Sequence, residues 1–301
     1  MVKRSTILSY QLILQKRLLP YFGEATDISE KDAQRFIMEK HAQGLSRHTV
    51  RDSVTVLKQI MKYGRKHRMA SYDDWELEYP RDDRPRRLPV LSVPDHRKLL
   101  DRLTEAPTPN NIGVLLSLCA GMRIGEVCAL RWEDVDLKAR TITVSRTAGR
   151  VYDCVSRKTA LIDSPPKTRN SYRVIPVSAP LHLALRTVRK LSRSEYVVSG
   201  IDYVRPMEPR GCREYFARIL KKAGIPAIVF HGLRHTFATR CVESGCDVKT
   251  LSAILGHSNV AITLNLYVHP DDAQKKQCVD RMYRFLSPKR GKSANGPAAP
   301  Q

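Results

Sequence analysis

The sequence has no long hydrophobic run. No stretch approaches the roughly 18 apolar residues of a membrane-spanning helix, and the best one, Val114–Ala120, has the length of a core segment. Near the N-terminus, polar residues at Ser5, Ser9 and Gln11 interrupt the apolar positions and no small-residue cleavage site follows, which argues against a signal peptide. We therefore expect a cytoplasmic protein without a membrane segment.

Cysteine pairs and cofactor motifs are also missing. The seven cysteines include no CxxC pair, so the sequence predicts neither a zinc framework nor a disulfide scaffold, and a reducing compartment fits. His231 and His235 have zinc-ligand spacing, but Gly232 stands where a zinc protease needs glutamate. The sequence contains no GxxxxGK(S/T) loop, no GxSxG turn and no acidic cluster of a two-metal nuclease. We expect neither a metal nor another cofactor.

Acidic residues are scarce compared with basic ones. The 301 residues contain 52 Lys and Arg against 30 Asp and Glu, which gives a formal net charge of +22. Such an excess favours a polyanionic partner, nucleic acid before an anionic membrane surface. Hydrophobic residues make up 42% of the chain, enough for packed cores, and the length corresponds to about two domains.

The first 70 residues have the periodicity of a helical domain. Apolar residues recur at helical spacing over Ile7–Leu19, and Ser29 with Asp32 resembles a capping box that opens a second helix. Ser46 is the expected N-cap of a third helix. The buried stripe of that helix is expected to be Val50, Val54, Leu57, Ile60 and Met61. Its other face carries basic residues and is either solvated or directed at DNA. We take four of these as candidate DNA contacts: Arg47, Arg51, Lys58 and Lys62.

Composition divides the chain into two domains. Three prolines and six charged residues lie between Pro80 and Pro89, which is typical of a linker. We expect a helical DNA-binding domain over 1–79, a linker over 80–90, a catalytic domain over 91–288 and a disordered tail over 289–301.

The second domain is expected to be mainly helical with a few strands. Val93–Thr104, Asn111–Ala120 and most of 180–286 have helical patterns. Ala160–Asp163 and Ser171–Val177 are strand-like and flank a polar stretch, which predicts a β-hairpin with Lys167 in its turn.

Three segments, 121–135, 231–239 and 255–269, place chemically active side chains at suggestive spacings. His231 and Arg234 are three residues apart, so a helix places both on one face, and an imidazole beside a guanidinium suits a phosphate site. Arg123 lies between two glycines, where the backbone can turn tightly. Each of these signals is weak alone, and a single helical tyrosine such as Tyr267 is more often structural than catalytic.

Together, the segments resemble the tyrosine recombinases, the family of phage-type integrases and Xer-like recombinases. The resemblance covers residues 4–286 and is strongest over 115–136, 164–177 and 228–270. The matching motif positions are Gly121, Arg123, Gly125, Glu126, Leu130, Trp132 and Asp134; His231, Leu233, Arg234, His235, Thr236, Ala238 and Thr239; and Leu255, Gly256, His257 and Tyr267. The five motifs stand in the expected order, so a chance match is negligible. They carry Arg123, Lys167, the pair His231 and Arg234, His257, and Tyr267.

The resemblance implies a mainly α-helical fold with a small antiparallel β-sheet. An N-terminal helical core-binding (SAM-like) domain would close with a catalytic domain as a C-shaped clamp around double-stranded DNA. Integrases of lambda type carry a further N-terminal arm-binding domain. Because the core-binding pattern begins almost at Met1, we expect this domain to be absent or truncated.

The resemblance also assigns chemical roles. Tyr267 would attack a DNA phosphodiester, form a 3′-phosphotyrosyl bond and free a 5′-hydroxyl, which needs no ATP. Arg123 and Arg234 would hold the non-bridging oxygens as charge grows on them. Lys167 would protonate the leaving 5′-oxygen, although Lys158 lies nearby and the alignment of this segment is loose.

Three further residues receive roles in the same way. His231 would take part in acid–base transfer with the nucleophile, and His257 would hydrogen-bond the phosphate. Glu126 matches an acidic position that supports the site without reacting.

The implied partners are a specific core recombination site, three further copies of the chain in a homotetramer joined through residues 271–286, and an excisionase or a host DNA-bending factor. The alternative for 271–286 is packing on its own domain. The size of the chain is Xer-like, but the nucleophile segment and the insertion over 148–164 favour a mobile-element integrase. A DNA-binding regulator without activity and a type IB topoisomerase are the remaining alternatives.

Overall fold

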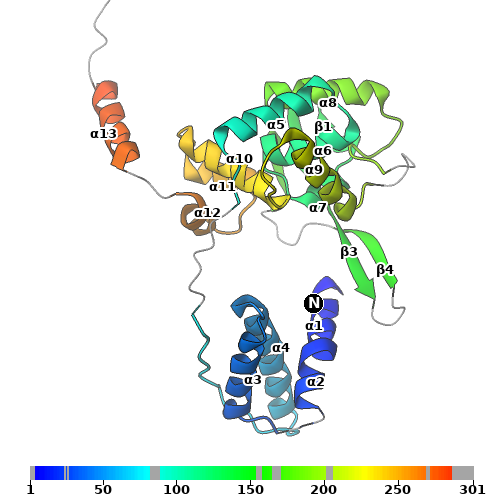
Figure 1. Ribbon diagram of the computed structural model, residues 1–301, viewed down its shortest axis with the longest axis vertical. Coiled ribbons are helices and arrows are strands. Elements are labelled where there is room, and N and C mark those ends of the chain that lie inside the picture. The colour runs from blue at the N-terminus through cyan, green and yellow to red at the C-terminus, as the bar shows by residue number, and fades with distance from the viewer. Residues whose placement is uncertain are drawn as a thin grey trace, which may run out of the picture.

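The structure is a computed structural model that describes residues 4–23, 25, 27–81, 89–153, 158–164, 171–200, 206–268 and 272–286. Figure 1 shows a small body of N-terminal helices and a larger body formed by the elements that follow residue 89. Each body has its own hydrophobic core, one lying between Leu18 and Trp75 and the other beginning at Leu91. In the part of the chain that is described, no helix has the length and apolar character needed to cross a bilayer.

The N-terminal body consists of helices only. Its elements are α1 (Arg4–Ile13), a π-helical turn (Leu14–Leu18), α2 (Leu19–Phe22), α3 (Glu30–Ala42) and α4 (Arg47–Lys66). The expected helix starts are confirmed. Ser29 and Asp32 form a complete capping box at α3, and the Ser46 side chain accepts a hydrogen bond from the backbone of Thr49 at α4.

The buried face of α4 differs from the predicted stripe at one position. Val50, Val54, Leu57 and Met61 are buried, but Ile60 is 41% exposed. At about 100° per residue, position 60 faces the same side of α4 as the buried Ser53 and Val56, so its exposure reflects where along the helix that side is covered and not its direction. The extended segment 70–79 packs Tyr72 and Trp75 into the same core, and Val56 is buried as well.

The larger body is mainly helical and encloses α6. Its helices are α5 (Val93–Glu105), α6 (Pro109–Ala120), α7 (Ile124–Ala129), a 3₁₀ turn (Trp132–Asp134), α8 (Ala179–Leu191), α9 (Pro209–Ala223), α10 (His231–Glu243), α11 (Val248–Leu255), α12 (Val260–Tyr267) and α13 (Asp272–Leu286). Helix α6 contacts α5, α7, α8, α9 and α10, and nearly all of its residues are buried. It therefore forms the centre of the core from which the motif-bearing segments emerge.

In the described part of the chain, five short strands form two antiparallel sheets. They are β1 (Val135–Asp136), β2 (Thr141–Val144), β3 (Thr147–Asp153), β4 (Lys158–Ser164) and β5 (Arg173–Pro176). The first sheet has the order β1-β2-β5, and the second pairs β3 with β4. The predicted hairpin between the last two strands is wrong, because β4 pairs with β3 and β5 pairs with β2. Alternation identifies strands but does not specify their partners.

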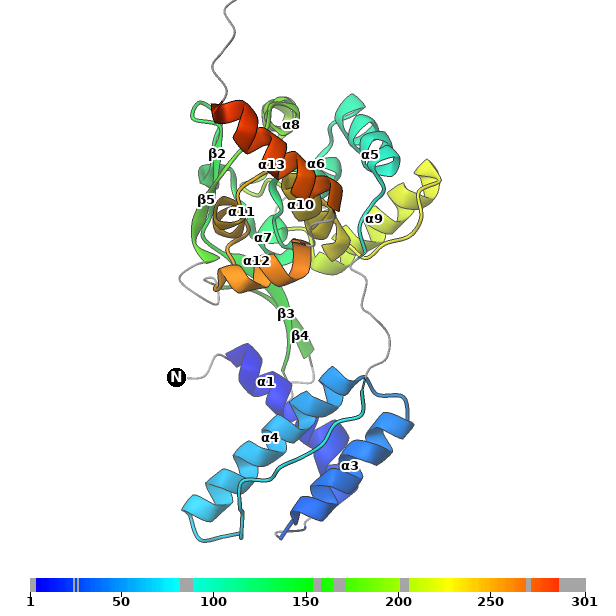
Figure 2. The same cartoon turned by 90° about the vertical axis from the view of Figure 1, so that its left-hand side faces the viewer.

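The two bodies approach each other through β3, which contacts α1. In Figures 1 and 2 the β3–β4 ribbon reaches from the larger body toward α1. At the other end of the chain, α13 projects beyond α11 and α12 in Figure 1. Four of its apolar side chains are at least half exposed: Val279, Met282, Tyr283 and Leu286. Among the described residues, this face of α13 is therefore largely exposed.

Candidate active site

The segment around Arg123 is shaped by the two glycines that flank it. Gly121 ends α6 in the left-handed conformation, with φ +63°, and a Cβ there would lie 2.7 Å from the ring of Phe237. Gly125 lies against β3, and a Cβ there would lie 2.7 Å from the backbone oxygen of Ala148. Glycine at position 121 lets the chain turn sharply after α6, and glycine at position 125 lets α7 pack closely on β3. Together they position Arg123, the residue immediately before α7.

The C-terminal end of α11 gathers three arginines. Arg173 Nε donates to the carbonyl of Ile254 at 2.6 Å. Arg234 Nη2 donates to the carbonyl of Leu255 at 2.7 Å, and Arg123 Nη2 donates to the carbonyl of Gly256 at 3.3 Å. Carbonyls at a helix C-terminus lack intrahelical partners and carry partial negative charge. Three consecutive carbonyls, 254 to 256, therefore position guanidinium groups that come from β5, α10 and the start of α7.

Glu126 lies between two of these arginines. Arg173 donates to both of its carboxylate oxygens, at 3.0 and 2.8 Å, and Arg123 donates through Nη1 at 2.9 Å and through its backbone at 2.8 Å. Burial alone would raise the pKa of Glu126, but the hydrogen bonds and charge of Arg173, with those of Arg123, lower it below its usual range. The carboxylate is therefore ionised and holds both guanidinium groups in place.

Arg234 is buried, with an exposed fraction of 1%. Its two Nη atoms donate to the carbonyls of Gly121 and Leu255, both at 2.7 Å. Burial, followed by the nearby charge of Arg123, lowers the pKa of Arg234 to about 9, so the side chain still carries its charge at neutral pH. Of the three guanidinium groups, Arg123 and Arg173 contact the carboxylate of Glu126, whereas Arg234 contacts only carbonyls among the described residues, which leaves the cluster with excess positive charge suited to an anion.

Tyr267 is the last residue of α12 and is buried beside α10. Its hydroxyl lies 2.7 Å from Nδ1 of His235. Burial raises the pKa of Tyr267, although the charges of Arg234 and Arg123 oppose this, so the hydroxyl keeps its proton at neutral pH. Burial, then the charges of His231 and Arg234, lowers the pKa of His235 to about 4, so this imidazole is neutral.

The other two histidines of the motifs flank this pair. His231 opens α10, and its exposed ring meets the ring of His235 edge-on at 4.7 Å. His257 follows the end of α11; its ring is parallel to that of Tyr267 at 6.5 Å, and its Nδ1 lies 2.8 Å from Oγ1 of Thr263. Partial burial, followed by the charges of Arg234 and Arg123, lowers the pKa of both rings.

The first residues of the larger body are attached to α10. The backbone of Leu91 donates to Oγ1 of Thr236 at 3.0 Å, and Arg240 donates to the carbonyl of Leu91 at 2.8 Å. A Cβ on Gly232 would lie 2.7 Å from the carbonyl oxygen of Pro89. Residues 89–91 are thus fixed to α10 along three turns.

The structure brings together six of the seven residues that the sequence selected for the site: Arg123, Glu126, His231, Arg234, His257 and Tyr267. Lys167 lies outside the described residues. Two members of the cluster, Arg173 and His235, were not predicted. Arg173 begins a short strand, and His235 is four residues from His231, a spacing that was considered only for zinc.

The four candidate DNA contacts on α4 lie elsewhere, and three of them contact the segment 72–79. Lys58 donates to the carbonyl of Trp75 at 2.6 Å, Lys62 pairs with Asp74 at 3.0 Å, and Arg51 lies over the ring of Tyr79. Arg47 forms no ion pair with a described residue. Three of these cations therefore help to hold the extended segment on α4.

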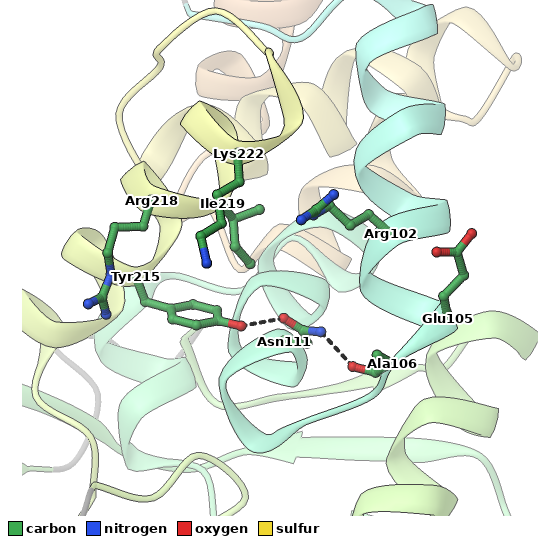
Figure 3. Close-up of a pocket in the computed structure, with 8 residues that line it drawn as sticks. All are labelled: Arg102, Glu105, Ala106, Asn111, Tyr215, Arg218, Ile219 and Lys222. Carbon is green, nitrogen blue, oxygen red and sulfur yellow. Dashed lines mark hydrogen bonds between the residues drawn. The ribbon is translucent and has the colours of Figure 1, made fainter.

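A separate hollow of about 470 Å³ lies among α5, α6 and α9 (Figure 3). On its floor, Tyr215 donates to Asn111 at 2.6 Å, and Asn111 donates to the carbonyl of Ala106 at 2.7 Å. Arg102 and Lys222 line it from the two outer helices. None of its lining residues belongs to the cluster around Tyr267.

The comparisons with known proteins identify a family. The chain matches the phage integrase family over residues 90–274, more than half of its length. A XerC-like tyrosine recombinase of Caldanaerobacter subterraneus subsp. tengcongensis is 33% identical over an alignment of 185 residues that covers 56% of this chain and 47% of that protein. Tyrosine recombinase XerA of Pyrococcus furiosus is 26% identical over 92% of this chain and 88% of its own length.

Solved structures share the fold. The integrase of transposon Tn1549, in complex with transposon right end DNA, has a TM-score of 0.78 at 23% identity, covering 94% of this chain and 95% of that one. A lambda integrase dimer bound to a core site has a TM-score of 0.62 at 15% identity, covering 87% of this chain and 91% of that one. The expected fold, mainly α-helical with small antiparallel sheets, is confirmed. The family match over most of the chain means that the protein belongs to the phage integrase family: it is a tyrosine recombinase, an enzyme that cleaves and rejoins DNA.

Proposed function

We propose that this chain is a site-specific integrase of a mobile element, in which Tyr267 cleaves DNA at a core recombination site. Tyr267 attacks the scissile phosphorus, its oxygen replaces the 5′-oxygen, and a 3′-phosphotyrosyl bond stores the energy of the broken bond. The 5′-hydroxyl of the partner strand then attacks this bond and releases the tyrosine. The single observation that carries the proposal is the convergence of Tyr267 with buried arginines on one site.

The arginine cluster supplies the charge that the transition state requires. A phosphodiester that exchanges one ester oxygen for another passes through a state with more negative charge on its non-bridging oxygens. Arg123, whose side chain is 36% exposed, can meet such an oxygen, and Arg234 has N–H groups left after its two carbonyl contacts. Donors that are fixed before the substrate arrives need not reorganise during the reaction.

The remaining roles follow the resemblance and the positions of the side chains. The resemblance gives His231 a part in acid–base transfer with the nucleophile, and its ring is exposed on the same helix as Arg234. Nδ1 of His257 is engaged by Thr263, so its other ring nitrogen, Nε2, is the one that can hydrogen-bond the phosphate. Lys167 is proposed as the acid that protonates the leaving 5′-oxygen.

The choice of a mobile-element integrase over a Xer-like resolvase rests on the sequence. The nucleophile segment Leu264–Pro270 and the insertion that contains β3 and β4 favour a mobile-element integrase. The similarity to Xer recombinases supports a Xer-like resolvase as the alternative. Sequencing the DNA junctions that the purified protein produces from its native flanking region would distinguish them. Junctions at the ends of a repeat-bounded element support an integrase, and resolution of a chromosome or plasmid dimer supports the alternative.

We further propose that four copies assemble on DNA through α13. The apolar face formed by Val279, Met282, Tyr283 and Leu286 is exposed in the single chain, and burying it against a neighbouring copy would be favourable. An excisionase or a host DNA-bending factor is a further proposed partner. The protein would work in the cytoplasm, where its DNA substrate lies.

Replacing Tyr267 with phenylalanine tests the chemistry most directly. Tyr267→Phe removes the nucleophilic oxygen but keeps the ring, so covalent protein–DNA adducts should disappear. Binding to the same DNA should change by less than about twofold, because phosphate contacts that supply affinity are retained. The measurement uses a nicked suicide substrate containing the native core site, denaturing gels for the adduct and mobility shift for binding. An adduct formed by Tyr267→Phe at the normal rate would contradict the proposal.

A further inference from the structure

The hydroxyl of Tyr267 has one hydrogen-bond partner among the described residues, and this partner is His235. His231, to which the resemblance gives acid–base transfer, contacts His235 through its ring and forms no hydrogen bond with a described residue. His257 uses Nδ1 for Thr263 and faces Tyr267 only ring to ring. The imidazole that can exchange a proton with the nucleophile along an existing hydrogen bond is therefore that of His235.

The direction of this hydrogen bond follows from the chemistry of its two groups. A phenolic O–H is a stronger acid than a neutral imidazole N–H, and an imidazole nitrogen is a stronger acceptor than a phenol oxygen. Tyr267 therefore donates to Nδ1 of His235, and the proton of the neutral ring lies on Nε2. With its proton directed at α10, the tyrosine oxygen has its lone pairs free for the phosphorus.

We propose that His235 is the general base of DNA cleavage, the group that receives the proton of Tyr267 as the phosphotyrosyl bond forms. The bond from Tyr267 Oη to phosphorus forms while the bond from phosphorus to the 5′-oxygen breaks. The electron pair of the broken bond goes to the 5′-oxygen, which takes its proton from the proposed acid, Lys167. The proton of Tyr267 moves to Nδ1. In rejoining, the partner strand's 5′-hydroxyl gives its proton to Lys167 as its oxygen bonds to phosphorus, and the proton on Nδ1 returns to the released Tyr267 oxygen. This inference rests on the proposed function.

The charges around His235 link its basicity to the arrival of DNA. Its own helix contributes His231 and Arg234, and the burial and positive charge around the ring lower its pKa to about 4 in the absence of DNA. Of the helices packed against α10, α12 contributes Tyr267, α6 contributes only the Cys119 thiol, and α11 contributes Lys249 at its exposed N-terminal turn. Burial is the largest cause of the lowered pKa of His235, and the charges of His231 and Arg234 add to it. A phosphodiester bound at Arg234 and His231 adds negative charge beside these two groups, which raises the pKa of His235 from its value without DNA.

The test compares two variants on two substrates. In His235→Asn, the side-chain oxygen can accept the hydrogen bond near the position of Nδ1 but cannot hold a proton. The first substrate is a nicked suicide duplex with the native core site. The second has sulfur in place of the 5′-bridging oxygen, so its leaving group is a thiolate that needs no proton.

His235→Asn should form the covalent adduct about 10²–10⁴-fold more slowly on both substrates, with a rate that keeps rising with pH as hydroxide replaces the base. Lys167→Ala should be slow on the oxygen substrate and recover on the sulfur substrate. The control His182→Asn changes a half-buried histidine on α8 that hydrogen-bonds only the carbonyl of Leu137, and it should react at the normal rate.

Wild-type protein that forms no adduct would overturn the proposed function itself. If the wild type reacts and His235→Asn stays within threefold of it, or recovers on the sulfur substrate, the general-base assignment is wrong. Thermal unfolding and DNA binding are measured on every variant. If His235→Asn is unfolded, His235→Gln is tested in its place against the same outcomes.

Discussion

The charged groups around Tyr267 and those along α4 are organised in opposite ways. Around Tyr267, Glu126, Arg173 and Arg234 are at most 8% exposed, and each guanidinium group is held by a carboxylate or by helix carbonyls. On α4, the pair between Lys62 and Asp74 has side chains that are 59% and 80% exposed. Buried charges are costly unless they are fully paired, whereas exposed charges reorganise freely. The fixed charges around Tyr267 suit one phosphate held at one position. The exposed charges on α4 suit a polyanion that can bind in more than one alignment.

This contrast separates cleavage from binding. Changes in the buried cluster should affect the rate of adduct formation more than affinity, because only a few phosphate contacts are lost. Changes on α4 should affect affinity and its dependence on salt, with little effect on the chemical step. The predictions below begin with the change that tests this separation most severely.

Arg234→Lys should have the largest effect of the four substitutions. Lysine keeps the positive charge but cannot donate to the carbonyls of Gly121 and Leu255 and also to a phosphate in one planar arrangement. We expect adduct formation to fall by about 10²–10³-fold, and DNA affinity to change by less than about threefold because one phosphate contact of many is altered. Single-turnover cleavage and mobility shift measure the two quantities. If the rate of adduct formation and the DNA affinity fell by the same factor, the proposed separation of cleavage by the buried cluster from binding by α4 would be wrong.

Glu126→Gln should act mainly on stability. The substitution removes the charge that holds Arg123 and Arg173, and breaking a buried ion pair costs about 3–5 kcal/mol. Because the pKa of Glu126 is lowered in the folded protein, its contribution is present above the unfolded value and is lost as pH falls through the folded one. Chemical unfolding at pH 7 should therefore show a larger difference between variant and wild type than unfolding at acidic pH. A pH-independent difference would show that the carboxylate charge is not responsible.

The smallest effects are expected on α4, where two residues can be compared. Lys62 is engaged by Asp74, while Arg47 forms no ion pair with a described residue. Arg47→Gln should weaken DNA binding and reduce the slope of log affinity against log salt by about 1, and Lys62→Gln should have a smaller effect on both. Titrations at several salt concentrations provide the measurement. The order would be reversed if Lys62 leaves Asp74 for a phosphate when DNA binds.

Features encoded by neighbouring residues were predictable from the sequence. The capping box of Ser29 and Asp32, the N-cap at Ser46 and the glycines around Arg123 depend on interactions within a few positions, and the structure contains all of them. Six site residues were selected because their order matched a family, and the structure places them together. The limits of the domains remain a prediction.

Features that depend on distant partners were missed. The partner of β5 is β2 rather than β4, because the alternation of a short strand carries no information about its neighbour. Arg173 joins the cluster through carbonyls 81 positions later in the chain, and no local pattern indicates such a contact. The i, i+4 spacing of His231 and His235 was visible, but the contact between His235 and Tyr267 requires the packing of α12 on α10.

The attachment of residues 89–91 to α10 determines where this enzyme can be divided and recombined with another. A chimera that joins a foreign DNA-binding region at residue 92 would leave the contacts of Thr236 and Arg240 to the backbone of a foreign residue 91, whose path need not match that of Leu91. It would also place a foreign chain against Gly232, where a Cβ would lie 2.7 Å from the carbonyl oxygen of Pro89. A junction before Pro89 keeps these contacts with the catalytic parent. The engineering boundary for retargeting the recombinase therefore lies on the N-terminal side of Pro89, a few residues before α5 begins.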